Sequence, residues 1–163
     1  MLHQLNNLPD EELQELYDAI PVITLLIAGA DGDIEGSELE QSEKITKIRG
    51  FSGGEIMQDF YDHIGKDYKE RLTRWAKIVP KDTAERNADL SARLEKLNPI
   101  LAKLTNHLGA EMYHSFTTFA KHVAKASGGF WGFASINKEE AELINLPMIT
   151  PIIKEEEEGG IQA

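Results

Sequence analysis

An acidic run near the N-terminal end carries the side chains best suited to chemistry. Between Asp31 and Glu38, four carboxylates fall within eight residues, and two glycines allow the backbone to fold sharply. Hard cations such as Ca²⁺ and Mg²⁺ prefer carboxylate oxygens as ligands. Zinc prefers nitrogen and sulfur, and the chain has no cysteine. If the run binds a metal, its chemistry therefore favours Ca²⁺ or Mg²⁺ over Zn²⁺.

The run matches a calcium-binding EF-hand loop only in part. Asp31, Asp33 and Glu35 stand at the first, third and fifth places of such a loop. Ser42 stands at the twelfth place, where that loop uses a glutamate with both oxygens on the metal. A second interpretation needs no metal, because Glu38 can stabilise a helix N-terminus and Asp31 can begin a simple turn. Both interpretations stay open on the residues alone.

Two other groups of residues have weaker chemical potential. His107, Glu111 and His114 share one helical face, but their spacing is not that of a zinc motif, and we interpret them as polar flanks of the core. The aromatic run from Phe130 to Phe133 could dock a partner or a membrane surface, or fold back onto the bundle. The sequence contains no glycine-rich phosphate loop, nucleophile elbow or catalytic-triad spacing. We therefore expect no enzyme activity and no catalytic residues.

Helices must position these groups, because helix signals dominate the chain and hairpin signals are nearly absent. Leucines spaced four and three apart from Leu90 to Leu108 predict an amphipathic seam, which Asn98-Pro99 would kink and Gly109 would interrupt. The seam favours packing within one bundle, with a homodimer interface as the alternative. We expect helices over residues 9–20, 21–30, 37–50, 52–65, a short one ending at 79, a long one from 82, and a last one over 137–146, with Pro21 opening or kinking the second of them. The predicted core includes Val22, Leu25, Leu26, Leu94, Leu101, Phe116 and Phe119.

Length and charge limit the class of protein. A chain of 163 residues with 41% hydrophobic composition can bury one complete core. Residues 1–43 hold eleven acidic side chains and no Lys or Arg. A field of that sign repels phosphate backbones, so we expect no nucleic acid and instead a cation or a basic protein partner. The alternative is that this acidic end pairs with the basic middle of the chain.

We expect a location in the cytoplasm and no transmembrane segment. The first seven residues lack the features of a secretory signal, and the longest apolar run, from Ile20 to Ala30, is too short to cross a bilayer. The last ten residues, 154–163, contain four consecutive glutamates and two glycines. We therefore expect an all-helical domain over residues 1–153 and a flexible acidic tail over 154–163 that is dispensable for stability.

A resemblance to a known family rests on the pattern Ala30-Asp31-Gly32-Asp33-Ile34 followed by Glu38 after a buried helix. It resembles the TerB-like domain of tellurite-resistance proteins. A degraded echo of the pattern runs from Ala124 to Gly128, with Glu140 as its clear acidic match.

The resemblance implies an all-α, single-domain bundle of about seven helices, with two pseudo-symmetric halves as one arrangement. It also implies a binding protein of stress response or tellurite resistance, with partners associated with membranes. The implied metal ligands are Asp31, Asp33, Glu35 and Glu38. The alternative function is a structural protein-protein interaction module with an acidic face and no metal.

Overall fold

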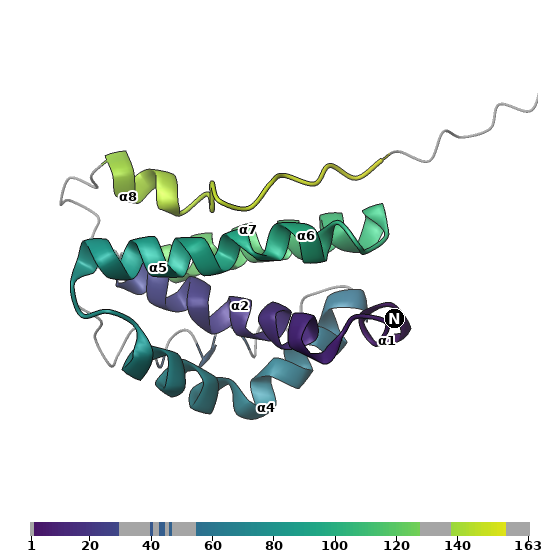
Figure 1. Cartoon of the computed structure of the whole chain (residues 1–163), viewed down its shortest axis with the longest axis horizontal. Coiled ribbons are helices and arrows are strands. Elements are labelled where there is room, and N and C mark those ends of the chain that lie inside the picture. The colour runs from purple at the N-terminus through teal and green to yellow at the C-terminus, as the bar shows by residue number, and fades with distance from the viewer. Residues whose placement is uncertain are drawn as a thin grey trace, which may run out of the picture.

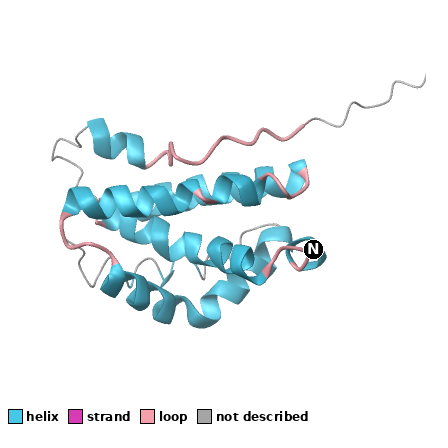
Figure 2. Ribbon diagram, viewed as in Figure 1, coloured by secondary structure: helices cyan, strands magenta, loops and turns pink. Residues whose placement is uncertain are grey.

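Helices are the only regular elements in the part of the chain that the structure describes (Figure 2). The computed structural model describes residues 2–29, 40, 43–44, 46, 55–127 and 138–155. The predicted all-α fold is confirmed. The helices are α1 (Leu2–Leu5), α2 (Asp10–Ala28), α4 (Glu55–Ile78), α5 (Thr83–Glu95), α6 (Leu97–Leu101), α7 (Asn106–Ser127) and α8 (Lys138–Leu143).

Helix α2 is the centre of the fold, with α4 on one side and α5 and α7 on the other (Figure 1). Every residue from Ala19 to Ala28 is buried. A helix that is apolar on all sides must be enclosed by other elements, and these three helices enclose it. All seven predicted core residues are buried, from Val22 at 3% exposed to Phe116 and Phe119 at 0%. The predicted core is therefore confirmed.

Two helix boundaries predicted from single residues are wrong. Pro21 neither opens nor ends a helix, because it lies within the continuous α2. Pro21 removes one backbone hydrogen bond, at a cost of about 3 kcal/mol. The burial of the apolar residues on both sides of it offsets that cost. Gly65 likewise lies inside the continuous α4, where a glycine costs only about 1 kcal/mol relative to alanine.

The leucine seam is divided differently from the prediction. Asp82 caps α5 by accepting a hydrogen bond from the backbone nitrogen of Glu85 at 2.9 Å. The predicted long helix breaks at Lys96 and again over residues 102–105, whereas Gly109 lies within α7. The seam still points to the core of its own chain, since its leucines at 90, 94, 97, 101 and 108 are buried. A homodimer stays a prediction.

After α8, the described residues 147–155 form a segment without helix or strand that lies along the helices. Helix α8 ends at Leu143, before the predicted end at residue 146, and the chain then turns at Leu146 with a φ of 49°. A left-handed conformation costs a leucine about 1–2 kcal/mol. The fully buried side chain of Leu146 holds it there. Residues 147–155 then run beside α6 and α7 without helix or strand (Figure 1).

Candidate functional site

The predicted metal ligands Asp31, Asp33, Glu35 and Glu38 lie outside the described residues, as does the aromatic run from Phe130 to Phe133. The structure does describe what lies on either side of the acidic run. Helix α2 ends at Ala28, and Gly29 follows as its C-cap. The described residues at 40, 43, 44 and 46 are helical. The acidic run therefore joins a helix to a second helical stretch, as the sequence predicted.

A buried arginine holds the end of α2 immediately before the acidic run. One guanidinium nitrogen of Arg86 donates to the carbonyl of Gly29 at 2.7 Å, and another donates to the carbonyl of Lys81 at 3.4 Å. Arg86 is only 5% exposed. Hydrogen bonds from a charged donor contribute about 1.5–3 kcal/mol, so Arg86 stabilises the point at which the chain leaves α2.

Arg86 also places a permanent positive charge close to the start of the acidic run. Asp31 follows Gly29 by two residues, which a fully extended chain covers in about 7 Å. Sequence reasoning missed Arg86, because it is 57 residues from Gly29 and belongs to no motif. The positive charge of Arg86 attracts the carboxylates of the acidic run, with or without a metal. The same charge repels a metal cation that binds to those carboxylates.

The acidic end also pairs with the basic middle of the chain. Asp18 accepts from Arg71 at 2.8 Å and from Arg74 at 3.2 Å. Glu12 pairs with Lys103. The alternative interpretation of the acidic end is therefore confirmed for these residues. Fewer unpaired carboxylates are therefore left to bind an external partner than the eleven acidic residues of positions 1–43 would indicate.

Arg71 is the centre of this network between α2 and α4. It is 7% exposed and also contacts Asp67 at 2.8 Å, the side-chain oxygen of Gln14 at 2.9 Å, and the ring of Tyr17 at 5.6 Å from its centroid. Burial alone would lower the pKa of Arg71, but the hydrogen bonds and charges of Asp67 and Asp18 outweigh it and raise that pKa. Burial raises the pKa of the Tyr17 hydroxyl, and the charge of Arg71 offsets part of that increase. The network is a structural joint between the two helices.

The weaker histidine group does not converge. His107 and His114 are exposed, and Glu111 pairs with Lys154 at 3.6 Å. His63 stacks on Tyr17, with ring centroids 4.2 Å apart. Within the described ranges, no three His, Asp or Glu side chains are grouped as a metal site would need.

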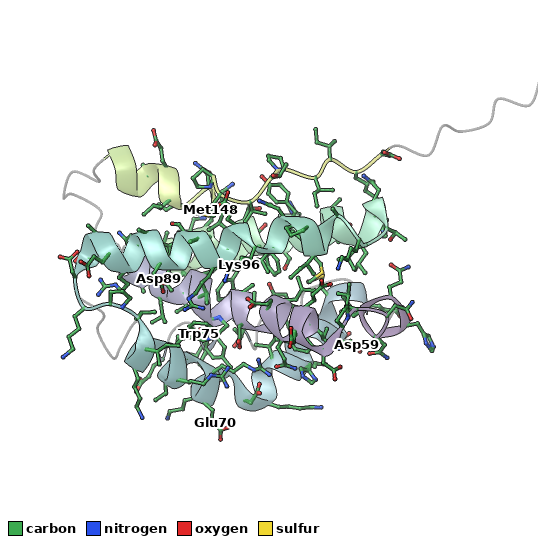
Figure 3. The ribbon with its side chains drawn as sticks, viewed as in Figure 1. Asp59, Glu70, Trp75, Asp89, Lys96 and Met148 are labelled. Atoms are coloured by element: carbon green, nitrogen blue, oxygen red, sulfur yellow. The ribbon has the colours of Figure 1, made fainter. Side chains whose placement is uncertain are left out.

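A wide hollow lies along the outer face of α4, where Glu70 points away from the bundle (Figure 3). Lys66, Lys69 and Lys77 line it together with Asp67 and Glu70. Charges of both signs alternate along the hollow, so it has no field of a single sign that would select one class of ligand.

None of the described helices is long and apolar enough to cross a membrane. In comparisons with known proteins, no family model, no curated protein and no solved structure matches the chain.

Proposed function

We propose that this chain is a TerB-like binding protein of stress response, in which Asp31, Asp33, Glu35 and Glu38 bind a divalent cation. Ca²⁺ and Mg²⁺ suit this ligand set better than Zn²⁺, because all four side chains offer oxygen. The proposal includes no catalytic step. It starts from the sequence pattern of the acidic run and from the resemblance that the pattern carries.

The structural observation that supports the proposal is that the C-terminal end of α2 is fixed by a hydrogen bond. Arg86 holds the carbonyl of Gly29 at 2.7 Å inside the protein, and the chain enters the acidic run two residues later. Ion-binding loops depend on flanking elements that are themselves held in place. The buried α2 supplies such an element on one side, and the described residues 40, 43, 44 and 46 on the other side are helical.

The alternative function is a protein-protein interaction module that recruits a basic partner and binds no metal. It is favoured by the acidic side chains that stay exposed on the described helices, Asp10 and Glu11 on α2 and Glu55, Asp59 and Asp62 on α4. An exposed field of this sign accelerates association with a basic protein and is screened by salt.

Calorimetry and thermal melting of the whole chain with CaCl₂ and MgCl₂ separate the two functions. Binding at a hundredfold excess over the dissociation constant stabilises the folded state by about 2.7 kcal/mol. For a chain of this size, that corresponds to a rise of roughly 5–10 °C in melting temperature. Asp31→Asn and Glu38→Gln should each weaken the binding, whereas the matched control Glu140→Gln should leave it nearly unchanged.

The outcome that rejects the metal proposal is the absence of binding heat for either cation at millimolar concentration. The interaction module then becomes the better account. It is tested by titrating a lysine-rich peptide, whose binding should weaken about tenfold or more when salt is raised from low to physiological ionic strength.

A further inference from the structure

Two asparagines of the helices beneath it hold the backbone of the segment 147–155. The side-chain amide nitrogen of Asn98 donates to the carbonyl of Met148 at 3.0 Å, and its oxygen accepts from the backbone nitrogen of Thr150 at 2.8 Å. Asn106 repeats this arrangement five residues further along. It donates to the carbonyl of Ile153 at 3.0 Å and accepts from the backbone nitrogen of Glu155 at 2.9 Å.

Because both asparagines make the same pair of hydrogen bonds, the way in which the helices bind the segment can be stated. A primary amide carries a donor and an acceptor side by side. It can therefore bind the carbonyl of one residue and the N–H of the second residue after it at the same time, both beside the turn at residues 147–149 and in the irregular chain at 153–155. Both asparagines use this spacing, at 148 and 150 and at 153 and 155. Such contacts read the backbone of a segment and not the identity of its side chains.

Apolar contacts add selectivity to the backbone contacts. Ile149 is 1% exposed and belongs to the core, and Met148 faces the helices below it (Figure 3). Ile152 lies over Gly109, where an added Cβ would come within 3.3 Å of both the Cδ1 of Ile152 and the carbonyl oxygen of Leu101. Gly109 thus leaves the space that a branched aliphatic side chain needs at this position.

The two halves of the segment are held unequally. Leu146 and Ile149 are buried core residues, whereas Ile153 is 82% exposed and every residue from Thr150 to Glu155 is exposed except the partly buried Ile152. A hollow of about 440 Å³ also lies beside this outer half, lined by Leu101, Leu104, Thr105, Gly109 and Ile152. The outer half can therefore leave the surface while the inner half stays anchored.

We propose that the surface of α6 and α7 around Asn98, Asn106 and Gly109 is a peptide-binding groove, which the segment 147–155 occupies in cis. Its partner is a protein that presents a segment with the chemistry of the outer half, a branched aliphatic residue followed by a cation two residues later. In this chain those positions are Ile152 and Lys154, and Lys154 contacts Glu111 at 3.6 Å. The partner segment replaces the outer half and also fills the hollow beside it.

The test uses the full chain labelled with ¹⁵N and a synthetic peptide with the sequence of residues 147–155. The cis occupant acts at a high effective concentration, so it must be weakened for the peptide to compete. In the Ile152→Asp chain, the peptide should shift the side-chain amide of Asn106 and the backbone amide of Gly109. Half-saturation should need at least about ten times less peptide than in the wild-type chain.

Two controls make the result specific. A peptide that carries Ile152→Asp should shift neither resonance, and adding Asn106→Ala to the Ile152→Asp chain should weaken the binding about tenfold or more. The exposed amide Gln58 on α4 supplies the matched control, since Gln58→Ala should change nothing. Circular dichroism establishes that each variant keeps its helices, and Ile152→Ala serves as the weakened chain if the aspartate variant unfolds.

The proposal is overturned if the peptide shifts neither resonance in the weakened, folded chain at millimolar concentration. It is also overturned if light scattering shows the wild-type chain to be a dimer that Asn106→Ala converts to a monomer, because the groove then holds the segment of a second copy. These outcomes are independent of cation binding at the acidic run.

Discussion

Replacement of Arg71 tests whether the polar joint between α2 and α4 stabilises the fold. Arg71→Met keeps an apolar stem of similar length but leaves Asp18 and Asp67 without their cation. Breaking a buried ion pair costs about 3–5 kcal/mol. Asp18 is 14% exposed and Asp67 is 39% exposed, so water can solvate the second carboxylate. We therefore expect the lower end of that range, about 3 kcal/mol, which is roughly 6–12 °C in melting temperature.

Arg74→Met is the matched control, because it removes a charge from the same helix and from the same Asp18. The side chain of Arg74 is 58% exposed, and exposed ion pairs contribute about 0–1 kcal/mol. Urea denaturation of both variants and of the wild-type chain gives the two free-energy differences. Equal losses for the two variants, or a loss below about 0.5 kcal/mol for Arg71→Met, would contradict the assignment of Arg71 as the buried centre.

Three further predictions follow from single sites. Gly65→Ala should raise the free energy of unfolding by about 0.5–1 kcal/mol, because no atom lies within 4 Å of the added Cβ, and a fall in melting temperature would contradict this. The pKa of Tyr17 is raised in the folded state, so its contribution to stability is complete below pH 10 and is lost as the pH rises above that value. Urea unfolding at about pH 9 and pH 11 should therefore show a smaller loss for Tyr17→Phe than for the wild type, and equal losses would refute the assignment. Ending the chain at Glu155 should leave the melting temperature nearly unchanged, whereas ending it at Leu146 should lower it, and calorimetry that finds no difference would show that the segment 147–155 is not docked.

The sequence by itself was sufficient for the fold class and the core. Helix signals and the spacing of apolar residues depend on the 3.6-residue period of the helix, which is a local property of the chain. The same locality explains the capping of α5 by Asp82, whose partner Glu85 is three residues away. The acidic run could also be located from its composition alone, although its ligands stay a prediction.

Only the tertiary structure decided where helices end and which polar groups meet. Pro21 and Gly65 are local breakers, but the burial of apolar residues before and after each of them in the helix outweighs costs of about 1–3 kcal/mol. The contacts of Arg86 with Gly29 and of Asn98 and Asn106 with the segment 147–155 join residues 47 to 57 positions apart. A period or a motif describes neighbours along the chain. Such contacts arise only when packing brings groups that are distant along the chain close together in space.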